Sequence, residues 1–104
     1  MINYGKQTIE TSDIKTVTKI LKSNFLTQGP MIDLFQNKIK NFFGSKYCTV
    51  VSNGTAGLYL AGKALKWKKG DKIITSPITF IASDNAIVLS GAQPILIDID
   101  AKTY

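Results

Sequence analysis

Short β-branched runs alternate with helical patterns over the second half of the chain, and this alternation limits the fold more than any other feature. The first of these runs is almost wholly apolar, which is typical of a strand buried on both faces. The runs are 47–51, 72–75 and 94–99. Between the first two runs, Leu58, Ala61 and Leu65 recur at helical spacing, which predicts a helix that ends at about Leu65. Between the second and third runs, a helix is predicted from about Phe80 to Leu89. This order of elements predicts βαβ units on a parallel sheet, and therefore an α/β fold.

The first half of the chain is expected to be helical after an extended arm. Thr11 or Ser12 is predicted to cap a helix over about 13–23, because a side-chain oxygen there can accept a free N–H of the first turn. Pro30 suits the first position of a second helix, and Gly44 is expected to end it. We assign residues 1–30 to an N-terminal arm, helix and loop, and 31–104 to the first part of a larger domain.

The number of predicted strands is small for a parallel sheet. Such a sheet has both faces covered and usually contains more than three strands. Here the 104 residues end soon after the third predicted strand. We therefore expect the chain to be the front portion of a longer α/β protein.

The composition excludes several classes of site. The chain has no histidine, so neither histidine acid–base catalysis nor histidine metal ligation is available to it. The single cysteine, Cys48, is expected to be buried in a strand and cannot form an internal disulfide. Apolar runs fall far short of the roughly 20 residues that span a bilayer, and the N-terminus lacks a signal-peptide pattern. The sequence predicts a cytoplasmic protein with no membrane partner.

The positive charge suggests an alternative function. The net charge is +6, and all 13 basic residues are lysines. Their densest group, 63–69, includes Trp67, so a small basic nucleic-acid-binding domain with a stacking aromatic is one interpretation. Lysines near the negative end of a helix dipole are the simpler interpretation. Because arginine, which makes the commonest bidentate guanine contact, is absent, we expect no nucleic-acid partner.

The turn at 52–57 is the strongest candidate for a ligand site. It connects the first predicted strand to a helix, at the sheet edge where open α/β sheets bind ligands. Gly54 allows close approach, Thr55 adds a hydroxyl, and the helix start offers free N–H groups to a phosphate. A turn with a Ser or Asn N-cap is the structural alternative. Neither G-x-x-x-x-G-K-[ST] nor G-x-G-x-x-G is present, so a module for another phosphate-bearing cofactor also stays open.

The segment 76–83 is predicted to lie at the same edge. Phe80 could rest against a flat ring whose phosphate is held nearby, or could fill the core. Asp98 and Asp100 follow the last strand, but no third ligand lies near them in the sequence. We expect these carboxylates to form turns, and we expect no metal site.

Three segments carry a resemblance to a known family. Residues 53–56, 70–83 and 91–100 resemble the DegT/DnrJ/EryC1/StrS family of sugar aminotransferases, which depend on pyridoxal 5′-phosphate (PLP). The resemblance covers essentially the whole chain, and residues 4–7 and 26–29 look most like the pseudaminic-acid branch. It implies part of the parallel-sheet large domain of the type I (aspartate aminotransferase) fold. It also implies a homodimer that transfers an amino group from glutamate to a nucleotide-linked 4-keto-6-deoxy sugar.

The resemblance also implies roles for particular residues. Thr55 and Ala56 would donate N–H groups, and Thr55 its hydroxyl, to the PLP phosphate, while Phe80 would stack on the pyridine ring. The implied cofactor-binding set is Asn53, Gly54, Thr55, Ala56 and Phe80. The implied sugar-nucleotide set is Tyr4, Asn24, Phe25, Leu26, Thr27 and Gly54. Many relatives carry serine where this chain has Asn53, a change that backbone binding of the phosphate should tolerate.

The family's catalytic groups have no counterpart here. The family implies a lysine that bonds covalently to PLP and moves a proton, and a carboxylate that pairs with the pyridine nitrogen. Both would follow residue 104, and none of the 13 lysines lies in a matching context. We therefore assign no catalytic residue and expect the chain by itself to be inactive.

Overall fold

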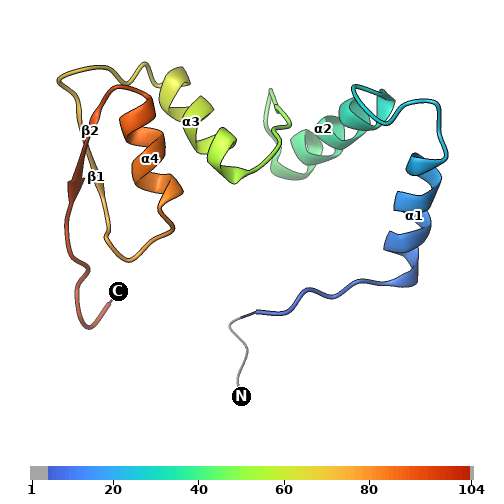
Figure 1. The fold of residues 1–104 in the computed structure, drawn as a ribbon, viewed down its shortest axis with the longest axis horizontal. Helices are drawn as coiled ribbons and strands as arrows, with labels where there is room; N and C mark the ends of the chain where they lie inside the picture. Colours follow the sequence, from blue (N-terminus) through green and yellow to red (C-terminus); the bar gives the residue numbers. More distant parts are fainter. Residues whose placement is uncertain (1–4, 104) are drawn as a thin grey trace. The chain divides into compact units, whose positions relative to one another are not determined.

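The computed structural model describes residues 5–103, and the chain divides into two compact units, Met1–Val50 and Val51–Tyr104. The first unit contains helices α1 and α2. The second contains helices α3 and α4 with strands β1 and β2 (Figure 1).

Helix α1 (Thr11–Leu21) begins earlier than the sequence predicts. Glu10 is its N-cap residue, and the Asp13 carboxylate accepts the N–H of Glu10 at 2.9 Å. The predicted cap at Thr11 or Ser12 is therefore wrong, because both residues lie inside the first turn. Asp13 explains the earlier start of the helix, because its negative charge is favourable at the positive helix end and its carboxylate accepts the N–H of Glu10.

Helix α2 (Pro30–Phe43) confirms the predicted boundaries. Gly29 is the N-cap residue and Pro30 is the first helical residue. Gly44 ends the helix in the left-handed region, with φ 63°, and its N–H donates to the carbonyl of Asn41 at 3.3 Å. Proline at the start and glycine just past the end are the favoured terminal residues of a helix.

The strand predicted at 47–51 is absent, and that prediction is wrong. Tyr47 is 78% exposed, and Cys48 is half-buried rather than enclosed in a core. The cause is the lack of a partner, because a strand exists only where a neighbouring strand completes its hydrogen bonds. In the described residues no strand pairs with this segment.

The second unit is a β–α–β arrangement with one preceding helix. Its elements are α3 (Gly54–Ala64), β1 (Lys72–Thr75), α4 (Ala82–Leu89) and β2 (Gln93–Leu96). The strands are parallel, and the pairing extends beyond them through N–H donation from Ile97 to the Thr75 carbonyl at 2.9 Å. Helix α4 contacts both strands and α3. The predicted parallel βαβ unit is confirmed, although α4 begins two residues after Phe80.

The core of this unit lies under α4 and is built from small residues. Ala82, Ala86, Ile87 and Ala92 are buried, and Ser90 is buried beside them. On α3, Gly62 is buried, and a Cβ placed on it would lie 2.6 Å from both Ser90 Oγ and Trp67 Cε3. The absence of a side chain at Gly62 therefore allows the close packing of α3, α4 and the Trp67 ring.

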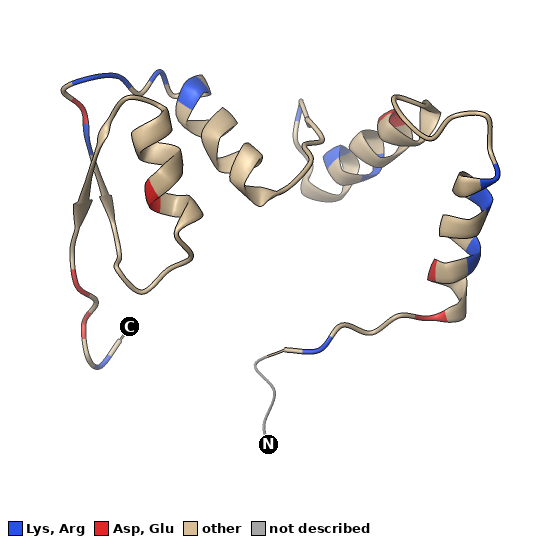
Figure 2. Ribbon diagram, in the orientation of Figure 1, with Lys and Arg blue, Asp and Glu red and all other residues tan. Residues whose placement is uncertain are grey.

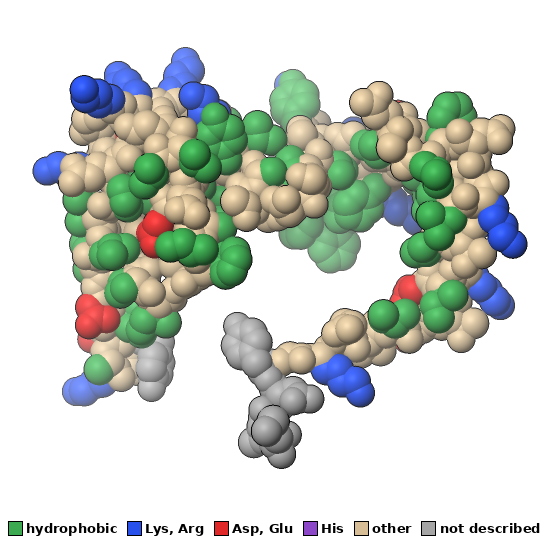
Figure 3. Space-filling view, in the orientation of Figure 1, with side chains coloured by type: hydrophobic (Ala, Val, Ile, Leu, Met, Phe, Trp, Pro, Cys, Tyr) green, Lys and Arg blue, Asp and Glu red, His purple; other side chains and the backbone are tan. Residues whose placement is uncertain are grey.

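Many large apolar side chains are at the surface of both units (Figure 3). On α1, Ile14 is 58% exposed and Leu21 65%, and on α2 Phe42 is 82% exposed. Neither of these helices contains a buried residue. Within residues 5–103, no helix combines the length and the apolar composition needed to cross a membrane.

Candidate functional site

The candidate site comprises the start of α3 and the loop at the carboxyl end of β1. Both strands run toward this end of the unit, and the first turns of α3 and α4 lie at the same end (Figure 1). Helices α3 and α4 pack against each other, and the start of α3 and the loop before α4 are the two parts of the candidate site. The 76–81 segment directly follows the carboxyl end of β1, whereas no strand precedes the 52–56 segment in the described residues, and α3 contacts α4 but neither strand.

The start of α3 offers two free amides. Asn53 is the N-cap residue, its Oδ1 accepts the N–H of Ala56 at 2.9 Å, and its carbonyl accepts the N–H of Gly57 at 3.2 Å. In the described part of the chain, no acceptor takes the N–H groups of Gly54 and Thr55. Because these donors sit at the positive end of the helix, they suit a phosphate.

The glycine at position 54 is not required by the packing of the protein. A Cβ on Gly54 would meet no atom within 4 Å, and the residue is the helical first position of α3. Alanine is the better residue inside a helix, so neither packing nor backbone conformation accounts for glycine here. The open space beside Gly54 leaves the backbone here accessible to a group that approaches it closely.

Phe80 lies in the loop between β1 and α4, outside the core. Its side chain is 74% exposed. The loop is ordered by hydrogen bonds of its own: Ile78 N–H donates to Ser76 Oγ at 3.1 Å, and the hydroxyls of Thr79 and Ser83 are 3.2 Å apart. The ring is therefore available at the carboxyl edge, and filling the core of this unit is not its role.

The predicted sugar-nucleotide residues fall in two units. Asn24–Thr27 form the exposed loop between α1 and α2, and Gly54 belongs to the second unit. Tyr4 lies outside the described residues. Sequence reasoning missed Ser23, whose hydroxyl donates to the Phe25 carbonyl at 3.1 Å and accepts the Phe25 N–H at 3.3 Å. A serine two residues before an exposed aromatic is the signal that could have revealed this local turn.

Sequence reasoning also missed a polar hollow in the first unit. It has a volume of about 440 Å³ and lies where the polar face of α2 meets the segment that follows the helix. Its lining residues are Asp33, Gln36, Asn37, Lys40, Lys46, Tyr47 and Cys48. The recurrence of polar residues at positions 33, 36, 37 and 40, at helical spacing, is the signal that marks this face.

Of the two aspartates after β2, Asp100 forms a turn as predicted, and Asp98 only accepts the N–H of the next residue. Asp98 Oδ1 accepts the N–H of Ile99 at 2.9 Å. Asp100 accepts the N–H groups of Lys102 and Thr103, which hold the pKa of its carboxyl below the ordinary value. Residues 5–103 contain no group of three or more acidic or cysteine side chains that could hold a metal ion.

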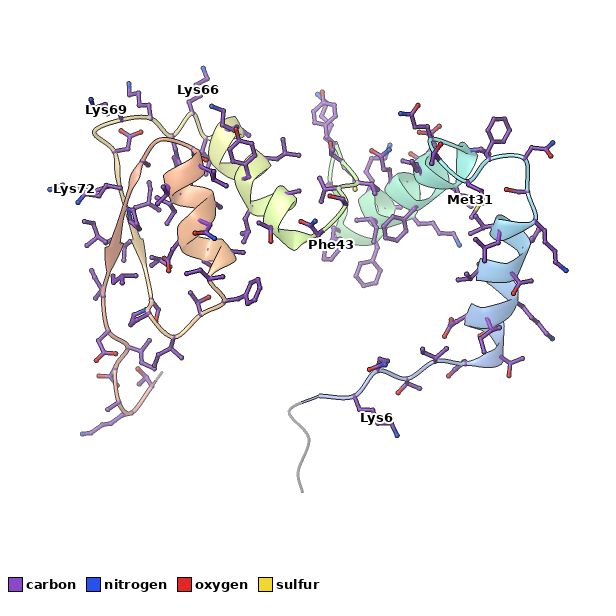
Figure 4. All side chains as sticks on the ribbon, viewed as in Figure 1. Lys6, Met31, Phe43, Lys66, Lys69 and Lys72 are labelled. Atoms are coloured by element: carbon purple, nitrogen blue, oxygen red, sulfur yellow. The ribbon has the colours of Figure 1, made fainter. Side chains whose placement is uncertain are left out.

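The densest lysine group lies away from the candidate site. Figure 2 shows the basic residues gathered around the end of α3 and the turn before β1, and Figure 4 shows Lys66, Lys69 and Lys72 at that end of the unit. Trp67 is half-buried and packs over Gly62. The ring is therefore committed to packing, which leaves little of it for stacking on a base.

The comparison with family models identifies the chain. Residues 7–104 match the DegT/DnrJ/EryC1/StrS aminotransferase family. The chain belongs to this family. Among curated relatives, it is 39% identical to the spore coat polysaccharide biosynthesis protein SpsC of Bacillus subtilis over 100 residues, 96% of this chain and 26% of the relative. It is also 39% identical to a UDP-4-amino-4,6-dideoxy-N-acetyl-β-L-altrosamine transaminase of Campylobacter jejuni, over 95% of this chain and 26% of that enzyme.

Solved structures confirm the type I fold of the PLP-dependent sugar aminotransferases. Spr1654 of Streptococcus pneumoniae, known in a PLP form, superposes with a TM-score of 0.87 at 27% identity, over 98% of this chain and 26% of that one. Helicobacter pylori PseC, an aminotransferase of pseudaminic acid biosynthesis, superposes with a TM-score of 0.84 at 31% identity, over 94% of this chain and 27% of that one. The chain thus spans about a quarter of the length of the relatives that it matches.

Proposed function

We propose that this chain is the phosphate-binding part of a PLP-dependent aminotransferase that transfers an amino group from glutamate to a nucleotide-linked 4-keto-6-deoxy sugar. The observation that carries the proposal concerns the start of α3, in a chain that belongs to this family. Two amide N–H groups there have no acceptor within the described residues, and the space beside Gly54 is open. The sugar class follows the relatives, because the Campylobacter jejuni enzyme is a UDP-sugar transaminase and PseC acts in pseudaminic acid biosynthesis.

In this proposal, the start of α3 binds the cofactor phosphate and Phe80 contacts the cofactor ring. The N–H groups of Gly54 and Thr55 hold the phosphate, and the Thr55 hydroxyl adds a third donor. Phe80, exposed at the head of α4, provides an apolar face for the pyridine ring. These contacts fix the position of the ring, and fixed geometry is a large part of what a protein contributes to a cofactor reaction.

The chemistry of amino transfer comes from the cofactor, which when bound withdraws electrons from the carbon that loses or gains a proton. The residues of this chain bind and orient. The lysine and carboxylate that the family requires are not assigned to any residue between 1 and 104. We further propose that Tyr4 and Asn24–Thr27 contact the sugar nucleotide, and that the enzyme is a cytoplasmic homodimer.

A turnover assay tests this function. The full-length protein, given PLP, glutamate and a UDP-linked 4-keto-6-deoxy-N-acetylhexosamine, is expected to form 2-oxoglutarate and an amino sugar in equal amounts, as measured by mass spectrometry. Residues 1–104 prepared alone are expected to form neither product. Turnover by this shorter chain would contradict the assignment of catalysis to residues outside it.

The product analysis also separates amino transfer from a related reaction. The GDP-4-keto-6-deoxy-D-mannose-3-dehydratase of Escherichia coli, solved with hydrated PLP, shares this fold with a TM-score of 0.82 at 29% identity. The fold therefore accommodates loss of water as well as amino transfer. A dehydrated sugar formed without incorporation of nitrogen would contradict the proposed reaction while leaving the cofactor site intact.

A further inference from the structure

The amide N–H of Ala56, at the start of α3, is already hydrogen-bonded within the protein. Asn53 Oδ1 accepts the N–H of Ala56 at 2.9 Å, while the neighbouring N–H groups of Gly54 and Thr55 have no acceptor within the described residues. The family resemblance implies that the Ala56 amide donates to the cofactor phosphate, so the same N–H has two candidate acceptors, the phosphate and Asn53 Oδ1. The following inference rests on the proposed function.

A phosphate oxygen and the Asn53 side chain cannot both take a well-aligned hydrogen bond from one N–H. The phosphate is charged, and hydrogen bonds to charged acceptors are roughly twice as strong as neutral ones. It also lies at the positive end of the helix. Asn53 is exposed, and its other hydrogen bond, from Nδ2 to Ser52 Oγ at 3.3 Å, is long. The side chain is therefore free to rotate away when a stronger acceptor arrives.

We propose that Asn53 is a positioning residue that competes with the cofactor phosphate for the N–H of Ala56 and thereby sets the affinity of the phosphate subsite. In the free protein Asn53 caps α3 and keeps its first turn helical. When the phosphate binds, it replaces the Asn53 oxygen, and the subsite gains a third amide beside those of Gly54 and Thr55.

A thermodynamic cycle gives the competition a definite sign. With phosphate bound, the same three amides donate to the phosphate in the protein with Asn53 and in the Asn53→Ala variant. Neither protein then has the hydrogen bond from the Ala56 N–H to residue 53. Without phosphate, only the protein with Asn53 has the cap. The free energy of unfolding that Asn53→Ala loses should therefore reappear as tighter phosphate binding. Loss of an Asn cap typically corresponds to about a fivefold change in an equilibrium constant.

The test uses the full-length protein and measures binding and stability separately. The dissociation constants of PLP and of inorganic phosphate are measured by titration, and the free energy of unfolding by urea denaturation. We expect Asn53→Ala to bind both ligands about fivefold more tightly and to unfold at lower urea. Asn53→Gly, which costs little as a cap, should change both quantities less. Binding of unphosphorylated pyridoxal should not change.

Two further variants serve as controls. Asn53→Asp keeps a capping oxygen but adds a negative charge beside the phosphate, so it should weaken binding. Asp13→Ala removes the oxygen that accepts the Glu10 N–H at the start of α1, so it should lower stability with no effect on phosphate affinity. The second control shows whether loss of any cap alters binding through stability alone.

The outcomes distinguish this inference from the proposed function. If Asn53→Ala binds phosphate equally or more weakly while it unfolds at lower urea, the competition is wrong and the cofactor site stands. If the protein with Asn53 shows no saturable binding of PLP, both proposals are wrong. Should Asn53→Ala fail to fold, the ratio of affinities for Asn53→Gly and Asn53→Asp decides, because equal affinities would overturn the competition.

Discussion

Asp100 orders the segment after β2 through one carboxylate oxygen. Its Oδ1 accepts the N–H of Lys102 at 2.8 Å, the N–H of Thr103 at 2.9 Å and the hydroxyl of Thr103 at 3.1 Å. Hydrogen bonds to the ionised form favour it, so they hold the pKa of Asp100 below its ordinary value, with the Lys102 amide contributing most. The side chain is fully exposed, so burial has little opposing effect.

The lowered pKa predicts a pH dependence of this turn. Because the pKa is lower in the folded turn than in the unfolded chain, the turn is stabilised above the unfolded value of 3.8 and loses that stabilisation as pH falls through the folded value. NMR titration of the Asp100 carboxyl carbon should give a midpoint below 3.8, and Thr103→Val should shift it part of the way back. A midpoint at or above that of aspartate in a short peptide would show that these hydrogen bonds do not form in solution.

At the scale of elements, the packing of α3 on α4 depends on the missing side chain at Gly62. A Cβ there would lie 2.6 Å from Ser90 Oγ, and Ser90 is only 5% exposed. The Trp67 ring lies equally close on the other side. Ser90 is buried and the Trp67 atoms belong to a rigid ring, so the contact cannot be relieved cheaply.

Gly62→Ala should therefore destabilise the protein although alanine favours helix. We expect a loss of about 1–3 kcal/mol in the free energy of unfolding, the usual range for overpacking a core. Gly54→Ala is the matched control on the same helix, because its Cβ would enter open space, and it should leave stability unchanged or slightly raised. Urea denaturation measures both. Equal midpoints for the two variants would contradict the described packing of α3 on α4.

The elements differ in how far the sequence could predict them. Helix α2 and strand β1 were predictable because local signals define them: Pro30 and Gly44 bound the helix, and Gly70 and Pro77 flank the strand. The absence of a strand at 47–51 was not predictable, because β structure depends on a partner strand and composition reports only burial and shape. The start of α1 was missed because a carboxylate three residues into the helix, Asp13, competes with the hydroxyls of Thr11 and Ser12 for the capping role.

The candidate site shows the same division. The place of the Phe80 loop after β1 follows from the order of strand and helix patterns, and Gly54 and Thr55 could be named from residue type alone. The sequence also offered a Ser or Asn cap at this turn, but the choice of Asn53 and of the Ala56 amide depends on one side-chain rotamer at the helix start. The sequence left two alternatives, a capped turn and a phosphate cradle. The structure shows the cap on one amide and two free amides beside it.

At the scale of the whole molecule, the residues of this chain account for only part of the proposed activity. This chain spans about a quarter of the length of its relatives. Within that quarter, we propose that the start of α3 binds the phosphate and that Phe80 faces the pyridine ring, while no lysine of the chain is assigned to proton transfer. The central claim is therefore about binding: the first amides of α3 hold the phosphate of PLP.

Amide chemical shifts test this claim most directly. The full-length protein, labelled with ¹⁵N, is titrated with PLP and separately with inorganic phosphate. Gly54→Val and Phe80→Ala are titrated alongside, since the first should weaken binding of both ligands and the second only that of PLP. The account predicts that the N–H resonances of Gly54 and Thr55 move first and saturate with both ligands. Shifts that gather instead at the lysines of 66–69, with Gly54 and Thr55 unchanged, would contradict it.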